Sequence, residues 1–202
     1  MKSKSSVLLS TALRTKKRFD RVVVFMLLFN LMANREMHAQ REEGVFVELG
    51  GASTTVGIHY DTRFGEKTHW GARIGIAYTR SKSPAFFDNL ADLTRGWTFP
   101  VAVNYLIGKR KNRAEIGIGV SYGLYTCVFY DKLGHQIEDG KSGSFAFLDL
   151  GYRYQPKKGL MVRLGVNPGM ALYESTVGKK DEAVFRAAVI YPYFSLGYNF
   201  LF

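Results

Sequence analysis

Ser53, His59 and Asp61 are the side chains of this sequence whose types and spacing come nearest to hydrolytic chemistry. A histidine within hydrogen-bond reach of a serine can take its proton and turn the hydroxyl into a nucleophile, while a third group orients the ring. His59 and Asp61 would lie on one face of a strand, because side chains two positions apart share a face. The same pair fits a packed polar interior without any catalytic role, and we favour that interpretation.

The other residues that could hold a ligand lack a supporting pattern. The run GIGVSYG at 117–123 is similar to a glycine-rich nucleotide loop, but it lies inside an alternating strand pattern and no helix follows it. His59, His69 and His135 have no cysteine or carboxylate at metal-ligand spacing. Cys127 is a lone cysteine, so no disulfide framework can form within the chain. We therefore expect no catalytic residues, no metal and no cofactor.

Period-two alternation is the main structural signal after residue 43. In 114–125, Ile116, Ile118 and Val120 share one face, while Glu115 and several glycines share the other. The same pattern recurs and predicts eight strands, at 44–51, 55–64, 70–79, 97–107, 114–125, 144–155, 160–169 and 190–202.

The connections between these strands alternate in length. Short turns are expected at 65–69, 108–113 and 156–159, and long loops at 81–96, 129–143 and 171–188. The first connection, 52–54, is also short, although it lies on the side of the long loops. Such alternation indicates an all-β, up-and-down antiparallel meander, and eight strands can close into a barrel whose interior is filled by side chains.

The composition of the polar face indicates whether that face points into the barrel or outward to water. It holds four arginines and four acids but no lysine, whereas a water-facing surface would carry lysine as freely as arginine. An enclosed interior favours arginine, whose planar donors satisfy several acceptors. The opposite face is apolar, with aromatic residues near the strand ends, so we predict a transmembrane barrel rather than a soluble ligand-binding one. The predicted lumen charge cluster is Glu48, Asp61, Arg63, Arg73, Glu115, Asp149, Arg153 and Arg163, accompanied on the same face by His59, Asn104 and Asn167.

Several stretches carry a resemblance to a known class. VELGGAS (47–53), VNYLIGKRKNRAEIGIGVS (103–121) and LGYRYQPKKGLMVRLGV (150–166) are similar to uncharacterised outer-membrane proteins of Bacteroidota. The chain as a whole resembles the small outer-membrane β-barrels of Gram-negative bacteria, in the size class of the OmpA barrel and OmpX. That resemblance implies a C-terminal assembly signal read by the outer-membrane insertion machinery, matched here by Phe194, Leu196, Tyr198, Phe200 and Phe202.

The N-terminal segment has the pattern of a signal peptide. Residues 16–18 and Arg21 are basic, and the apolar run 22–33 is too short to span a bilayer as a helix. We predict a signal peptide at 1–39, with cleavage after Ala39, and a barrel at 40–202. Residues 1–39 carry eight of the 28 basic residues and only two of the 17 acidic ones, so more than half of the net charge of +11 belongs to this segment.

The remaining basic excess gathers in the short turns, as Lys67, Lys109, Arg110, Lys111, Arg113, Lys157 and Lys158 against Glu66 alone. A basic ring at one rim suits anionic lipid headgroups and does not suit nucleic acid. The segment 84–93, with its apolar side chains, would either bind a partner or membrane or fold over the barrel mouth.

Three functions remain open from the sequence. The first is a monomeric, non-enzymatic outer-membrane barrel with a plugged polar lumen, which has a structural role or meets an unknown extracellular partner through its long loops. The alternative is a narrow pore for ions or small solutes. A lipid-modifying outer-membrane enzyme built on Ser53 and His59 is the third.

Overall fold

The structure is a computed structural model of the 202-residue chain, and it describes residues 41–82, 91–108, 110–131, 133–176, 182–183 and 189–201. The predicted signal peptide and its cleavage position lie outside these ranges, so both stay predictions. None of the helical segments within the described ranges is long and apolar enough to cross a membrane.

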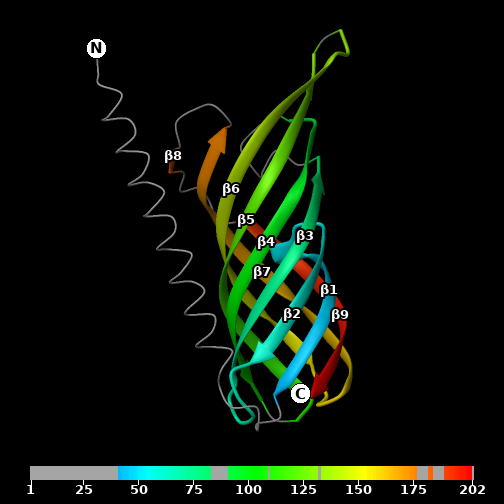
Figure 1. The fold of residues 1–202 in the computed structure, drawn as a ribbon, viewed down its shortest axis with the longest axis vertical. Helices are drawn as coiled ribbons and strands as arrows, with labels where there is room; N and C mark the ends of the chain where they lie inside the picture. The colour runs from blue at the N-terminus through cyan, green and yellow to red at the C-terminus, as the bar shows by residue number, and fades with distance from the viewer. Residues whose placement is uncertain are drawn as a thin grey trace, which may run out of the picture. The chain divides into compact units, whose positions relative to one another are not determined.

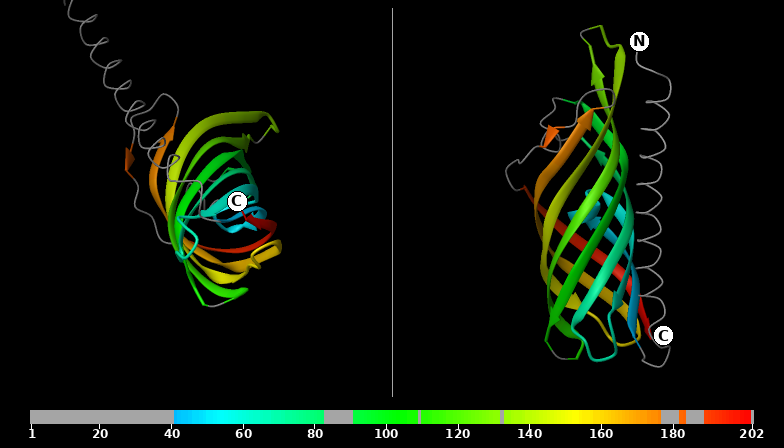
Figure 2. Two further views of the ribbon diagram at one scale, coloured as in Figure 1. Left: turned by 60° about the horizontal axis from the view of Figure 1, so that its bottom comes forward. Right: turned by 60° about the vertical axis from the view of Figure 1, so that its left-hand side comes forward.

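Eight long strands form one closed sheet (Figure 1). They are β1 (Glu42–Gly50), β2 (Val56–Arg63), β3 (Trp70–Ser81), β4 (Leu93–Ile107), β5 (Asn112–Tyr130), β6 (Gln136–Tyr154), β7 (Gly159–Thr176) and β9 (Val189–Leu201). Each pairs antiparallel with its neighbours, and β1 pairs with β9 from Glu42↔Leu201 to Gly50↔Tyr193, which closes the barrel (Figure 2). The two-residue strand β8 (Glu182–Ala183) pairs with β7 beside the barrel wall. The predicted fold, an eight-stranded up-and-down antiparallel barrel, is confirmed.

The wall of the barrel is uneven in height. β1 and β2 have 9 and 8 residues, whereas β5 and β6 have 19 each and rise together as a tall hairpin (Figure 1). The prediction of a long loop at 129–143 is therefore wrong, because strand pairing continues to Tyr130↔Gln136 and leaves only a short turn. The polar, glycine-containing sequence of 136–144 suggested a loop, but two strands that supply each other's backbone hydrogen bonds tolerate polar side chains beyond the apolar region.

The tight turn of this hairpin is held by Asp131. Its Oδ1 accepts hydrogen bonds from the backbone N–H groups of Leu133 and His135, both at 2.8 Å, and its Oδ2 lies 3.0 Å from Nδ1 of His135. Local capping of this kind is what makes aspartate favourable in turns. These backbone hydrogen bonds, together with one from the His135 ring to the carboxyl, lower the pKa of Asp131 below its usual value.

The connection between β1 and β2 turns inward instead of outward. It is a single turn of 3-10 helix, η1 (Gly51–Ser53), whose three residues are all buried. Gly51 has a φ of +55°, and a Cβ there would run into Oδ1 of Asn167, so a side chain would be strained and would clash. The N–H of Ala52 donates to Asn167 Oδ1 at 2.9 Å, which ties η1 to β7 across the barrel interior.

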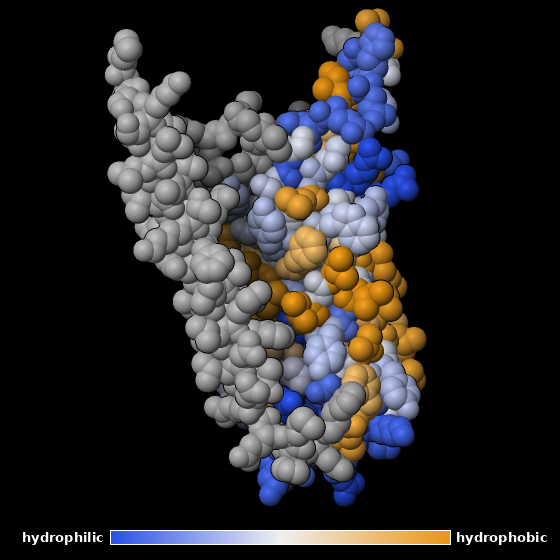
Figure 3. All heavy atoms as spheres, viewed as in Figure 1, coloured by the Kyte–Doolittle hydropathy of each residue, from blue (hydrophilic) through white to orange (hydrophobic). Residues whose placement is uncertain are grey.

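The outside of the barrel is apolar and the inside is charged. Ile118 is 63 % exposed on the outer face, whereas Arg163 on the inner face is 0 % exposed. Hydrophobic residues form a band at middle height, with hydrophilic residues at the ends (Figure 3). This arrangement is the reverse of that in a water-soluble barrel.

Two aromatic pairs mark the edges of that band. Trp70 packs edge-on against Tyr105 at the end with the short turns, and Tyr78 packs edge-on against Trp97 towards the other end, with ring centroids 5.0 and 5.2 Å apart. Trp70 and Tyr78 are both on β3, and eight residues of a strand tilted by about 40° rise by roughly 20 Å. That separation fits the two interfacial aromatic girdles that flank the apolar band of a membrane barrel.

Candidate functional site: the charged lumen

The eight residues predicted as a lumen charge cluster all lie inside the barrel and are 0–2 % exposed. They come from six different strands, and period-two alternation is what turns each of them inward. Asn104 and Asn167 are buried with them. The cluster contains four arginines and four carboxylates, so its formal charges balance when all are ionised.

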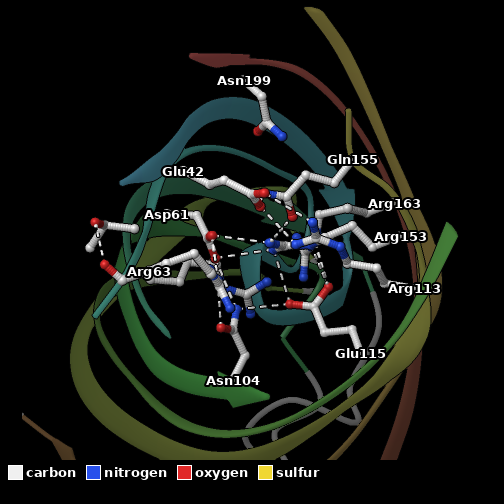
Figure 4. A network of polar contacts seen from close by, with 12 residues as sticks. Glu42, Asp61, Arg63, Asn104, Arg113, Glu115, Arg153, Gln155, Arg163 and Asn199 are labelled. Carbon is white, nitrogen blue, oxygen red and sulfur yellow. Dashed lines mark hydrogen bonds and ion pairs between the residues drawn. The ribbon is translucent and has the colours of Figure 1, made fainter. Parts of the chain in front are cut away.

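Asp61 and Glu115 organise the half of the cluster nearer the short turns (Figure 4). Arg153 donates to both oxygens of Asp61 at 3.0 Å and to both oxygens of Glu115 at 3.0 Å. Arg63 donates to Asp61 Oδ1 at 2.5 Å and to Asn104 Oδ1 at 2.7 Å. The amide of Asn104 in turn donates to Asp61 at 2.8 Å and to Glu115 at 2.9 Å. Every carboxylate oxygen in this half therefore has a donor.

Arg163 on β7 links that half to the next. Its Nε donates to Glu115 at 2.9 Å, and its two terminal nitrogens lie 3.1 Å from Glu48 and 3.1 Å from Asp149. Arg73 approaches the same two acids from β3, at 3.3 Å from Glu48 and 3.0 Å from Asp149. Arg163 is thus the one residue among those described that pairs with three of the four lumen carboxylates.

Aromatic rings surround the guanidinium of Arg163. It lies 4.5 Å from the ring centre of Phe46 and 5.0 Å from that of Tyr193. Such contacts stabilise a cation that is out of contact with water. Sequence reasoning described the inner face as polar and missed its apolar members Phe46, Leu106, Phe147 and Met161, all of which are buried. The alternation carried the signal for Phe46, which shares its face with Glu48 two positions later.

A second group of residues crosses the lumen at its short-turn end. Arg113 on β5 makes a bidentate pair with Glu42 on β1, with N···O distances of 2.7 and 3.0 Å. β1 and β5 are four strands apart in a ring of eight, so this pair spans the barrel. Gln155 donates to Glu42 at 3.3 Å and accepts from Arg153 at 3.0 Å, which joins the pair to the cluster above (Figure 4). Sequence reasoning placed Arg113 in a turn, because the strand was expected to begin at residue 114.

The other end of the lumen is filled by apolar side chains beneath η1. Ala52 of η1 packs with Ala102, Phe145 and Phe147, and all four are buried. Phe145 and Phe147 are in tilted contact at 6.0 Å between ring centres. The register of β6 and β7 shifts between Ser144 and Phe145, where an irregularity interrupts the ladder. Within the described residues, buried side chains thus occupy the short-turn end, the middle and the region beneath η1.

The structure brings together two of the residues that hydrolysis would need. Ser53 Oγ lies 2.6 Å from Nε2 of His59 and donates to Glu48 Oε1 at 3.0 Å. The carboxylate of Glu48, however, lies near Nε2 of His59, the same ring nitrogen that contacts Ser53. The other ring nitrogen, Nδ1, which an orienting group would bind, has no hydrogen-bond partner among the described residues. Asp61 points to the arginines instead. All three are 0–1 % exposed, so a substrate could not reach the hydroxyl in this arrangement.

The remaining predicted residues are spread over the structure. The stretch 117–123 lies within β5, and Cys127 is buried beside Thr94, with its sulfur 3.8 Å from Oγ1. Phe194, Leu196 and Tyr198 face outward from β9, Phe200 is half-buried, and Phe202 lies outside the described residues. Most of 84–93 also lies outside them. No group of three or more potential metal ligands occurs in the part of the chain that the structure describes.

A closed antiparallel barrel with an apolar outer band, aromatic girdles and a charged, filled interior defines the class of integral outer-membrane β-barrel proteins. The protein has that fold, and its location is the outer membrane. The sequence matches no protein-family model and no curated protein.

Solved structures similar to this chain are outer-membrane barrels with little sequence identity. The N-terminal β-barrel domain of Pseudomonas aeruginosa OprF is 10 % identical over 80 % of this chain and 98 % of that one, with a TM-score of 0.48. A major outer membrane protein from Thermus thermophilus is 12 % identical over 80 % and 99 %, with a TM-score of 0.47. Neisserial surface protein A is 8 % identical over 79 % and 94 %, with a TM-score of 0.42.

Proposed function

We propose that this protein is a non-conducting, non-enzymatic outer-membrane barrel whose role is structural or exerted at the cell surface. The observation that carries the proposal is the series of buried, paired side chains inside the barrel. Glu42 and Arg113 bridge opposite walls at one end, eight paired charges occupy the middle, and η1 with its aromatic neighbours fills the other end. An ion crossing this interior would have to displace several buried ion pairs at once.

The long-loop end is the part of the barrel suited to meet a partner. Outer-membrane barrels keep short turns in the periplasm and longer connections outside. In that orientation β5 and β6, the longest of the described strands, extend outward from the cell as a hairpin whose tip exposes Tyr130, Leu133 and Ile137. The partner's identity is open, and the lipids of the outer membrane surround the apolar band. The protein inserts as a monomer through the outer-membrane assembly machinery.

Conductance in planar bilayers tests the filled lumen. The folded protein, identified by its heat-dependent migration on gels, should give no conductance steps at loads where a porin of known activity gives many. The conductance of Arg163→Ala, which lacks the residue that pairs with three carboxylates, should be compared with the conductance of Arg95→Ala. Arg95 serves as the control because its ion pair with Glu138 is exposed. Regular steps from the unmodified protein would contradict the proposal and support the narrow pore.

The hydrogen bond between Ser53 and His59 favours a lipid-modifying enzyme as a second candidate. Movement of η1 would be needed to expose the hydroxyl. Mass spectra of lipid A and phospholipids should be identical in cells that make the unmodified protein and cells that make Ser53→Ala. A lipid species that depends on Ser53 would establish the enzyme and overturn the non-enzymatic proposal.

A further inference from the structure

A pocket of about 260 Å³ opens at the short-turn end of the barrel, outside the Glu42–Arg113 bridge. Its walls come from the last residue of β2 and the β2–β3 turn, from the β4–β5 turn and the start of β5, and from the first residue of β1. Four cationic side chains line it, Arg63, Lys67, Arg110 and Arg113, against the two acids Glu42 and Glu66. Of these charged residues only Arg63 belongs to the lumen charge cluster.

The cations of the pocket differ in how far they are already neutralised. Arg113 is paired with Glu42 at 2.7 Å, and Arg63 is paired with Asp61 at 2.5 Å. Lys67 and Arg110 make no ion pair with any residue that the structure describes, and both are exposed. The pocket therefore presents two positive charges without an ion-pair partner, and together with Glu66 they carry a net charge of +1.

Arg63 forms the inner wall of the pocket and carries an unmet donor. It is 2 % exposed, and its Nε has no hydrogen-bond partner among the described residues, although its terminal nitrogens bind Asp61, Asn104 and the carbonyl of His69. A buried donor without a partner costs free energy and is therefore rare in proteins. Arg63 therefore adds a buried positive charge to the wall of the pocket, while its Nε itself lies out of contact with solvent.

The pocket also lies next to the membrane interface. His69, which lines it, is in ring contact with Tyr105 at 5.6 Å, and Tyr105 packs against Trp70 in the aromatic girdle of this end. Lipid headgroups lie at the height of such girdles. An anionic headgroup is thus within reach of Lys67 and Arg110.

We infer that this pocket binds a phosphate group, either as part of an anionic lipid headgroup or as free phosphate. A phosphate has several acceptor oxygens in a tetrahedral arrangement, so it can meet an ammonium and two guanidinium groups from different directions. A planar carboxylate would be satisfied by a single arginine and would leave the other cations unpaired. The inference concerns this site alone and does not depend on whether the lumen conducts.

Two double variants separate a binding site from general attraction to a basic rim. Lys67→Gln/Arg110→Gln removes the two positive charges of the pocket that have no ion-pair partner. Lys157→Gln/Lys158→Gln removes the same charge from exposed lysines of the β6–β7 turn, which do not line the pocket. Heat-dependent gel migration shows whether each variant is folded before binding is measured.

Binding is measured with two probes. Inorganic phosphate is titrated into protein in an uncharged detergent by calorimetry, and phosphatidylglycerol is added to phosphatidylcholine nanodiscs and followed by phosphorus NMR. We expect the pocket variant to bind at least roughly tenfold more weakly, since a charge-assisted hydrogen bond contributes more than the free energy of a tenfold change. The Lys157/Lys158 control should retain binding within about twofold, as expected for exposed charges.

The pattern of results shows whether the pocket binds phosphate and whether that phosphate is the free ion or a lipid headgroup. A response to inorganic phosphate identifies the free ion as a sufficient ligand, whereas a response to phosphatidylglycerol alone identifies the headgroup, and either supports the site if it depends on the pocket variant. Equal weakening by both double variants would show only diffuse attraction to the rim and would overturn the inference. So would the absence of binding with both probes.

Discussion

Replacing Arg163 by methionine should destabilise the barrel more than any exposed ion-pair substitution. Arg163 contacts Glu48, Glu115 and Asp149 at 2.9–3.1 Å from a position with no solvent exposure. Methionine can occupy much of the same space between the aromatic rings but brings no charge. Each of the three acids keeps one other arginine, so the variant leaves one uncompensated negative charge in the lumen.

The expected magnitude follows from that single charge. Removing one partner from a buried ion-pair network costs about 3–5 kcal/mol of unfolding free energy, because the remaining charge stays out of water without a counter-ion. The matched control is Arg95→Met, since Arg95 pairs with Glu138 at 2.8 Å but the two side chains are 46 % and 41 % exposed. An exposed pair of this kind contributes about 0–1 kcal/mol.

The assay is reversible urea unfolding in lipid vesicles or detergent, followed by tryptophan fluorescence and gel migration. A further variant, Arg163→Met with Asp149→Asn, restores the charge balance of the lumen and should recover part of the lost stability. Equal losses for Arg163→Met and Arg95→Met would refute the reasoning, because they would show that burial of the pair has no consequence. A double variant less stable than Arg163→Met alone would refute the charge-balance explanation in particular.

Three further outcomes are expected. Gly51→Ala should lower the unfolding free energy by about 1–3 kcal/mol, since the new Cβ would clash with the side chain of Asn167. The control Gly134→Ala is also at positive φ but has nothing within 4 Å of the new Cβ, so it should lower the unfolding free energy by less. Equal losses would exclude the clash as the cause. The NMR titration of Asp131 should have its midpoint below the ordinary aspartate value of about 4, so the contribution of this carboxylate to the hairpin turn is present above that pH and is lost as the pH falls through the lowered pKa. A midpoint at or above about 4 would contradict this. Deletion of Phe202, the last residue of the predicted C-terminal assembly signal, should reduce the yield of heat-modifiable protein in outer-membrane fractions more than deletion within 84–93, and equal yields would argue against the signal.

Alternation in the sequence was enough to predict the eight strands and the inward direction of the lumen charges. Side-chain direction in a strand depends only on the parity of the position, so Arg73 and Glu115 could be assigned to one face without any knowledge of their neighbours. The absence of lysine from that face in the predicted strands then distinguished an enclosed interior from a water-facing surface, although β6 extends further than predicted and buries Lys141 as well.

The partners of each charge could not be predicted in the same way. Arg163 and Glu48 are 115 positions apart, and their contact depends on the register and tilt of strands that close the barrel. The bridge between Glu42 and Arg113 was missed for the same reason, because it requires two strand ends to face each other across the lumen. The inward turn of η1 depends on the positive φ angles of Gly50 and Gly51, which glycine permits but does not dictate.

The lumen cluster also makes barrel closure cooperative. Glu48 on β1 finds its counter-ions on β3 and β7, and Asp61 on β2 finds Arg153 on β6, 92 positions later. A partly formed sheet therefore carries arginines and carboxylates that lack part of their counter-ions and face lipid or a half-open interior, at a considerable cost in free energy. Pairs on neighbouring strands, such as Glu115–Arg153, can form in an open sheet, but the pairs that cross the barrel, Glu48–Arg163 and Asp61–Arg153, form only when the sheet closes. Intermediates with an open seam therefore lack these cross-barrel ion pairs and are less stable than the finished barrel. Insertion into the membrane should accordingly approach a two-state process. Only closure in the correct register places the lumen charges beside their counter-ions, so the interior favours the correctly closed barrel over other registers.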